Sequence, residues 1–130
     1  MSVLAYMGYY YYDVTYLLVI LGAVLSMIAS AQVNSTFKRY SRVRSGCGMT
    51  GAEAAERILY RNGLTNVRIE HISGNLTDHY DPSSKVLRLS DATYNATSVA
   101  AVGVAAHECG HAVQDARGYA PLKFRSALVP

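Results

Sequence analysis

The sequence predicts an α+β domain behind a single N-terminal transmembrane helix, and three patterns support this prediction. Residues 14–37 form a long apolar stretch without a charged side chain. Residues 66–72 and 85–90 alternate apolar and polar side chains, which is typical of short strands with one buried face. Residues 99–117 are rich in Val and Ala and predict a helix, with Thr97 or Ser98 as its N-cap and Gly118 as its stop. The chain has 130 residues, about the length of one domain, so these elements belong to one small fold.

The apolar stretch is long enough to span a bilayer. A transmembrane helix needs about 20 apolar residues, and residues 14–34 meet this requirement. Amphipathic tyrosine rings favour the membrane interface, and six tyrosines stand at the head of the stretch. They are Tyr6, Tyr9, Tyr10, Tyr11, Tyr12 and Tyr16. A signal peptide would carry Lys or Arg before its apolar part, and none precedes this one. We therefore predict a membrane anchor within residues 1–37, with a buried core helix as the alternative.

Basic residues follow the anchor within the segment 38–48. They are Lys38, Arg39, Arg42 and Arg44. Because loops rich in Lys and Arg stay on the cytoplasmic side, we expect the N-terminus outside and the rest of the chain in the cytoplasm, at the cell membrane. A nucleic-acid surface would carry more charge, interleaved with aromatic side chains. The chain therefore has the membrane as an expected partner and no nucleic acid.

The predicted domain covers residues 49–130. Thr50–Glu53 reads as a capping box, in which the threonine and glutamate side chains bond amides at the start of a helix. An apolar stripe continues that helix up to Gly63. A turn at 73–75 follows the strand predicted over 66–72, and a second turn at 81–84 precedes the strand predicted over 85–90. The order after the anchor is therefore helix, strand, strand, helix.

Residues 107–111 read His-Glu-Cys-Gly-His, an H-E-x-x-H match. His107 and His111 lie one helical turn apart on the same face, so both imidazoles can bind one zinc ion. Glu108 stands beside the first ligand, where a carboxylate can act as the base for a metal-bound water. A core helix with two buried histidines is the alternative, but it would leave a glutamate charge buried without a partner. The motif predicts zinc with His107 and His111 as ligands and Glu108 as the catalytic residue.

Two further side chains of this helix have expected positions. Cys109 lies inside the motif but points off the ligand face, and with Cys47 it makes too few thiols for a disulfide framework. Asp115 shares the ligand face but lies a full turn beyond His111. We therefore expect it to orient a ligand rather than to bind the metal.

Several characteristic blocks follow one another along the chain: the tyrosine-rich start with the anchor, Ser35–Ser45, Thr50–Glu53, Leu76–Pro82, Lys85–Ser90, Ala105–Gln114 and Gly118–Pro121. Through these blocks, the chain resembles the YugP-like family of membrane-anchored neutral zinc metallopeptidases over nearly its whole length. Blocks in this order are more specific than H-E-x-x-H alone. The resemblance implies a zincin-like, minimal gluzincin-type domain with a small antiparallel sheet. It also implies peptide-bond hydrolysis, with Glu108 as the general base.

By analogy with such folds, Lys85–Ser90 is the edge strand that binds extended substrate by β-addition. His79 precedes this strand, so we expect it to approach the metal or to contact the substrate's developing oxyanion. A loop histidine bonded to a carboxylate is the alternative. Tyr80 is a second possible oxyanion or substrate contact, with a packing role as the alternative.

The third zinc ligand is missing from the motif itself. A catalytic zinc needs three protein ligands, and the metzincin pattern is excluded because Gln114 and Arg117 replace its glycine and histidine. The resemblance implies a glutamate on a later helix, but no glutamate follows Glu108. The chain therefore looks C-terminally truncated relative to the family, with the third ligand expected beyond residue 130 or at His79.

Two function classes follow from the sequence. The first is a membrane-bound zinc metallopeptidase that acts on peptides or proteins. The second is a non-catalytic membrane protein with a weak or structural metal site, which acts by binding a partner.

Overall fold

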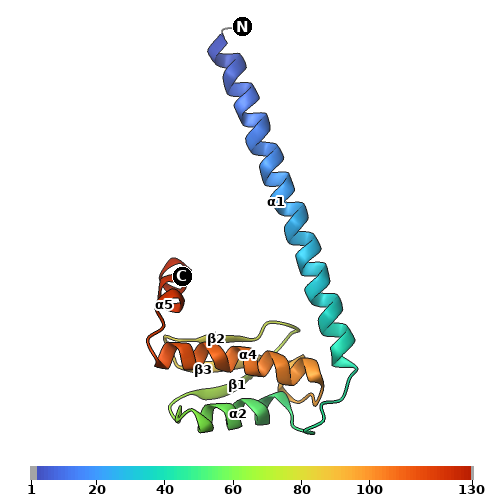
Figure 1. The fold of residues 1–130 in the computed structure, drawn as a ribbon, viewed down its shortest axis with the longest axis vertical. Coiled ribbons are helices and arrows are strands. Elements are labelled where there is room, and N and C mark those ends of the chain that lie inside the picture. Colours follow the sequence, from blue (N-terminus) through green and yellow to red (C-terminus); the bar gives the residue numbers. More distant parts are fainter. Residues whose placement is uncertain (1–2, 130) are drawn as a thin grey trace. The chain divides into compact units, whose positions relative to one another are not determined.

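The computed structural model describes residues 3–129, with side chains from Asp13 onward. The described chain has two compact units, one ending at Phe37 and one beginning at Lys38. The first contains most of helix α1 (Val3–Ser41), and the second contains the remaining elements. Figure 1 shows these elements along the chain.

Helix α1 contains one candidate membrane span. Residues Asp13–Ser41 form a 29-residue helix with a mean hydropathy of 2.2 in its most apolar part, and none of that part is buried. Large apolar side chains of this helix, among them Leu17, Leu18 and Met27, are exposed. Five of the tyrosines predicted at the membrane interface have side chains outside the described residues. They are Tyr6, Tyr9, Tyr10, Tyr11 and Tyr12.

Helix α2 (Gly51–Arg61) lies in the second unit, and the threonine part of its predicted capping box is present. The Thr50 hydroxyl accepts a hydrogen bond from the Glu53 amide at 3.1 Å, which satisfies an amide that the helix itself leaves unpaired. Gly51 lies close to the backbone of residue Thr93, and a Cβ atom at Gly51 would stand 2.2 Å from the Thr93 carbonyl oxygen. Only glycine fits this contact between α2 and the short helix α3 (Asp91–Tyr94).

The sheet has three strands in the order β1 (Arg68–Ile72), β3 (Val86–Ser90) and β2 (His79–Asp81). β1 and β3 are parallel, and β2 and β3 are antiparallel. The sheet is therefore mixed, and the prediction of an antiparallel sheet is wrong in part.

The placement of Lys85–Ser90 at the sheet edge is also wrong. β3 is the central strand, and β1 and β2 are the two edge strands. The sequence pattern did not predict β2. Val86, Leu87 and Leu89 are fully buried, as expected of a strand paired on both sides. The three residues of β2 include His79 and Asp81 and have no alternating apolar pattern, so they gave no strand signal.

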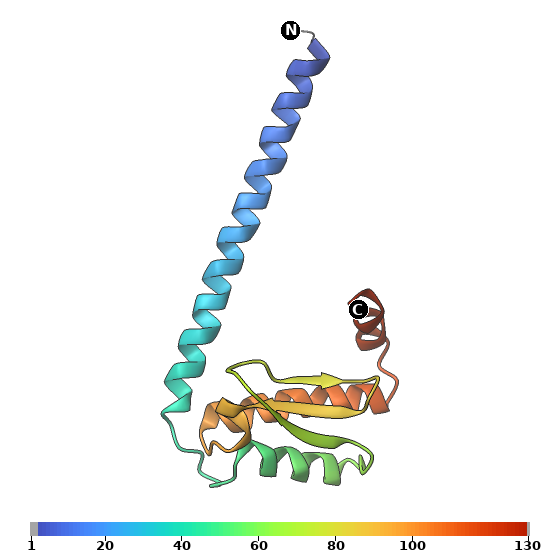
Figure 2. The same ribbon diagram turned by 180° about the vertical axis from the view of Figure 1, so that it is seen from behind.

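Helices α2 and α4 (Val99–Ala116) pack with the sheet around the core. Figures 1 and 2, which view the molecule from opposite sides, show these two helices alongside the strands. The fully or nearly fully buried cluster consists of Ala55, Leu59, Leu87, Leu89, Ala105, Cys109 and Ala112. Alanine and cysteine line the helix contacts, and such small side chains let the backbones approach closely. This core holds α4 in place against the sheet.

Helix α4 begins and ends close to the predicted positions. The Ser98 hydroxyl accepts a hydrogen bond from the Ala101 amide at 3.1 Å, which is the predicted type of N-cap. At the other end, Gly118 has φ of 69°, a left-handed conformation that terminates the helix. Helix α5 (Ala120–Leu128) follows and is anchored by the buried Leu122.

Candidate metal and catalytic site

Helix α4 places His107, Glu108 and His111 on the same side of the helix. The His107 and His111 rings lie 4.8 Å apart between centroids, with an angle of 84° between their planes. His107 is exposed, whereas His111 and Glu108 are half-buried. This pair of imidazoles is the arrangement expected from the spacing of the two histidines.

The opposite side of α4 holds the helix in the core. Cys109 and Ala112 are buried there, and the Cys109 thiol lies 3.6 Å from the Ala55 carbonyl oxygen, to which it donates. Burial, with a smaller effect of the Glu108 charge, raises the pKa of Cys109 to about 12. A buried thiol that stays protonated is a poor metal ligand. Cys109 is therefore a packing residue, as its predicted direction implied.

Gln114 contacts one of the two histidines, and sequence reasoning missed this role. His111 Nδ1 lies 3.1 Å from Gln114 Oε1. When Nδ1–H donates to this oxygen, Nε2 keeps its lone pair for a metal ion. The i, i+3 spacing on a helix could have revealed the contact, because it places the two side chains side by side.

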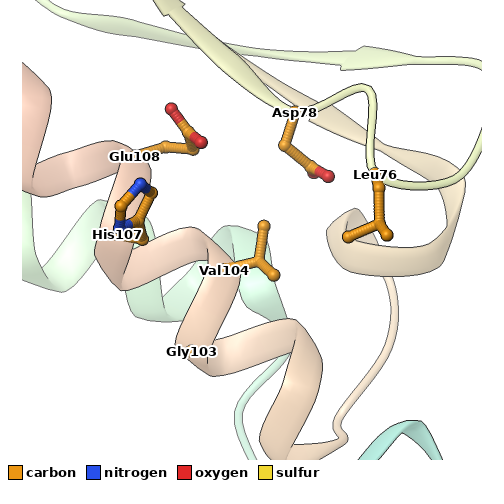
Figure 3. Close-up of a pocket in the computed structure, with 6 residues that line it drawn as sticks. All are labelled: Leu76, Asp78, Gly103, Val104, His107 and Glu108. Carbon is orange, nitrogen blue, oxygen red and sulfur yellow. The ribbon is translucent and has the colours of Figure 1, made fainter. Parts of the chain in front are cut away.

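Glu108 lies in a partly buried environment. Burial raises the pKa of its carboxyl above the usual range, and Asp78 adds to this, while the two motif histidines oppose it. Figure 3 shows the Glu108 carboxylate beside the His107 ring on α4, and Asp78 on the segment across from them. A carboxylate whose proton affinity is raised is better suited to accept a proton.

The motif side chains face a cleft of about 940 Å³. Residues from α4, β2 and α5 line it, together with the turn after β2. They include Asp78, His79, Tyr80, Asp81, His107, Glu108, His111, Leu122 and Arg125. A cleft of this size accommodates a ligand larger than a single side chain. The candidate residues His79 and Tyr80 therefore lie in the same cleft as the motif.

The His79 ring is engaged with neighbours of its own. Its Nδ1 lies 2.9 Å from the Thr77 carbonyl oxygen, and its Nε2 lies 3.4 Å from an Arg88 guanidinium nitrogen. His79 pairs with Arg88 in the sheet, so it points to the face opposite the neighbouring Tyr80. No group of three or more His, Cys, Asp or Glu side chains placed to hold a metal is present in the part of the chain that the structure describes.

The Tyr80 hydroxyl points to the last turn of α4. It donates to Asp115 Oδ2 at 2.8 Å, and the Lys85 ammonium donates to the same oxygen. Burial and the neighbouring Asp115 carboxylate raise the pKa of Tyr80 well above its usual value. The expectation that Asp115 orients a zinc ligand is wrong, because Gln114 contacts His111 and Asp115 ties β2 and Lys85 to α4.

The donor set partly fits zinc. Two imidazoles on one face are donors that zinc prefers, and a half-buried carboxylate lies beside them. Among residues 3–129, however, no third ligand joins the histidine pair. A helix-borne H-E-x-x-H motif that faces a cleft is typical of the metallohydrolase class.

The comparison with known sequences defines the class more closely. The chain belongs to the family described as "Putative neutral zinc metallopeptidase", whose sequence profile matches residues 15–130. It is similar to the "Putative membrane protease YugP" of Bacillus subtilis (strain 168), with 47% identity over 106 residues. The resemblance inferred from the motif blocks is therefore confirmed.

The matched segment covers 82% of this chain and 47% of the Bacillus protein. The chain thus spans about half the length of the relative that it matches. No solved structure matches the chain.

Proposed function

We propose that this chain carries the H-E-x-x-H part of a membrane-bound zinc peptidase that hydrolyses peptide bonds in peptides or proteins. The observation that carries the proposal is the pair of imidazoles on α4 with Glu108 beside them, facing a large cleft. Membership of a family described as zinc metallopeptidases supports it.

His107 and His111 would hold the zinc ion, and the chain's own residues have distinct tasks around it. When bound, zinc supplies Lewis-acid polarisation of a carbonyl and lowers the pKa of water. Gln114 holds the tautomer of His111. Glu108 accepts a proton from the attacking water and delivers it to the leaving amine, so the peptide C–N bond breaks without a covalent intermediate.

The third ligand is proposed to lie outside residues 3–129. His79 is the less favoured candidate, because both of its ring nitrogens have other neighbours in the described chain. The relative extends well beyond the matched segment, so it has room for a further ligand. His79 and Tyr80 line the cleft and remain proposed substrate contacts.

Substrate would enter the cleft along the outer edge of β2. β2 is paired on one side with β3 and is the edge strand nearest the motif helix, with Tyr80 bonded to α4. The backbone groups of an edge strand can pair with an extended peptide. This proposal replaces the central strand Lys85–Ser90 with β2 as the docking strand.

The proposed location is the cell membrane, with the catalytic unit in the cytoplasm. The candidate span in α1 and the name of the Bacillus relative support membrane attachment. The basic residues after the span support the orientation. We propose no nucleic-acid partner.

The decisive experiment is proteolysis of an unfolded protein in detergent, with and without Zn²⁺ and chelator. We would compare the chain, a version extended to the length of the Bacillus relative, Glu108→Gln and Glu56→Gln. Glu56 is exposed on α2 and lies outside the cleft, so its variant controls for the loss of a glutamate. The proposal expects zinc-dependent cleavage that Glu108→Gln reduces at least about 100-fold, while Glu56→Gln cuts normally.

The same experiment also distinguishes the peptidase from the second function class, a non-catalytic membrane protein with a structural metal site. Cleavage by the extended version alone would mean that the third ligand lies outside this chain. Zinc binding without cleavage in both versions would favour a non-catalytic protein with a structural metal site. The absence of a third ligand among residues 3–129 is the observation that keeps this class open.

A further inference from the structure

The segment at the end of helix α1 carries a cluster of exposed positive charge. Residues 38–44, which we call the basic segment, contain Lys38, Arg39, Arg42 and Arg44, and all four are exposed. None of the four forms an ion pair with the side chains that the structure describes. No aspartate or glutamate occurs from residue 14 to residue 52. Neighbours along the chain therefore leave this positive charge uncompensated.

Aromatic and apolar side chains lie among these charges. Tyr40 and Val43 are 41% and 45% exposed, and the Arg39 guanidinium lies over the Tyr40 ring, 5.7 Å from its centroid. Tyrosine rings favour the interface between lipid and water. The candidate membrane span ends at Ser41, within the same segment. This mixture of cationic, aromatic and apolar side chains suits a lipid surface.

We infer that the basic segment binds the headgroups of anionic phospholipids. Three of its four cations are arginines, and a guanidinium can donate two parallel hydrogen bonds to phosphate oxygens. Clusters of about four to eight basic residues beside a membrane helix attract anionic lipids. The cation of a zwitterionic headgroup would be repelled by the same charges. The inference goes beyond the proposed peptidase function and does not depend on it.

Two backbone hydrogen bonds attach the end of the basic segment to the start of helix α4. The Val99 amide donates to the Val43 carbonyl oxygen at 2.9 Å. The Ser45 amide donates to the Thr97 carbonyl oxygen at 2.8 Å. A flank that only sets membrane orientation acts through its charge and needs no such bonds. The basic segment is thus bonded to the helix that carries the motif.

Arg44 lies at the centre of this attachment. It forms an isolated β-bridge with Ser98, whose hydroxyl caps α4 by accepting a hydrogen bond from the Ala101 amide. A headgroup held by Arg42 and Arg44 therefore restrains the backbone that pairs with the start of α4. Because a ligand stabilises the arrangement that it binds, anionic lipid should slow the local opening of this attachment.

The first test measures lipid binding by the whole chain in an uncharged detergent. The chain is titrated with short-chain phosphatidylglycerol, with phosphatidylcholine of the same acyl length, and with inorganic phosphate. Amide NMR signals of residues 42–45 report binding at the basic segment. We expect phosphatidylglycerol to bind about tenfold or more tightly than phosphatidylcholine or phosphate. High salt should remove most of this preference, because exposed charges are screened.

Two double variants with the same change in net charge locate the site. Arg42→Gln with Arg44→Gln removes two charges of the basic segment. Arg61→Gln with Arg117→Gln removes two charges at the C-terminal ends of α2 and α4. All four side chains are exposed, so neither pair is expected to unfold the chain. The first pair should weaken phosphatidylglycerol binding about tenfold or more, and the second less than about twofold.

Hydrogen exchange at the Ser45 and Val99 amides tests the link to α4. In bilayer discs that contain phosphatidylglycerol, both amides should exchange about tenfold more slowly than in discs of pure phosphatidylcholine. Arg42→Gln with Arg44→Gln should remove this difference. The Ala54 amide, which bonds the Thr50 carbonyl oxygen at the start of α2, is the internal reference and should not change.

Four results would overturn the inference. Equal binding of the two lipids would mean that headgroup charge is not recognised. Phosphate that binds as tightly as phosphatidylglycerol would indicate a simple anion site in place of a lipid surface. Equal losses in the two double variants would indicate a general effect of net charge. Unchanged exchange at Ser45 and Val99 would reduce the basic segment to a charged flank. None of these readouts involves proteolysis, so the proposed function can fail separately.

Discussion

Gln114 illustrates how a single side chain can prepare a metal site. Its amide oxygen lies 3.1 Å from His111 Nδ1, and this bond leaves Nε2 as the free donor atom. Partners of this kind fix the ring orientation and the tautomer of a ligand, and their loss commonly weakens metal affinity about 10–100-fold.

We therefore predict that Gln114→Met lowers the affinity for Zn²⁺ about 10–100-fold, because methionine has a similar length but no comparable acceptor. Gln114→Glu keeps an acceptor oxygen and should retain most of the affinity. Competition titration against a chromophoric chelator measures both. Equal loss in the two variants would show that the hydrogen bond to His111 does not matter.

At the scale of elements, the contact between β2 and α4 depends on one carboxylate. Asp115 accepts hydrogen bonds from Tyr80 and Lys85, and its side chain is only 13% exposed. Burial alone would raise the pKa of Asp115, but the bonds from Lys85 and Tyr80 and the charges of Lys85 and Lys123 outweigh it and lower the pKa. The hairpin that lines the cleft is thus held to the last turn of the motif helix.

We predict that Asp115→Asn lowers the free energy of unfolding by about 1–3 kcal/mol at neutral pH, because hydrogen bonds from a charged donor are weakened. The lowered pKa means that the folded state favours the ionised form. This stabilisation is present above the unfolded pKa of about 4 and is lost as the pH falls through the folded value. Denaturant unfolding of the unchanged chain and of Asp115→Asn, at pH 7 and below pH 4, tests whether the difference in unfolding free energy becomes smaller at low pH. A stability difference that stays constant across this range would contradict the assignment.

A second prediction concerns the contact between α2 and α3. A Cβ atom at Gly51 would stand 2.2 Å from the Thr93 carbonyl oxygen, so Gly51→Ala forces backbone movement. We expect a loss of about 1–3 kcal/mol in the free energy of unfolding, despite the better helix propensity of alanine. Gly110→Ala, where a Cβ meets open space, is the matched control and should be neutral or stabilising. Calorimetric melting of the two variants distinguishes these outcomes.

At the scale of the whole molecule, the chain combines one candidate membrane span with one small α+β unit. Its two cysteines offer a natural probe of topology. Cys47 is exposed shortly after the basic segment, whereas Cys109 is fully buried. A hydrogen bond with the Ser45 hydroxyl at 2.8 Å lowers the pKa of Cys47, which increases its thiolate fraction.

We predict that a membrane-impermeant maleimide labels Cys47 only after cells are opened, because the basic flank places the domain in the cytoplasm. Cys47→Ser should abolish labelling in both conditions, since Cys109 is inaccessible. Labelling of intact cells would reverse the proposed orientation.

The sequence alone determined the features that depend on neighbours along the chain. The length of the apolar stretch, the caps at Thr50 and Ser98 and the one-turn spacing of His107 and His111 follow from local geometry, and the structure contains them. The His111–Gln114 contact is local in the same sense and could have been predicted.

Only the tertiary structure decided the order of the strands and the composition of the cleft. β2 became a strand because it pairs with β3, although its own residues have no strand pattern, and this pairing moved Lys85–Ser90 to the centre of the sheet. The bond from Tyr80 to Asp115 spans 35 residues. A pocket lined by Leu76 and Val104 likewise joins two distant segments. Contacts between distant segments depend on the packing of the whole core, and periodicity within one segment carries no information about them.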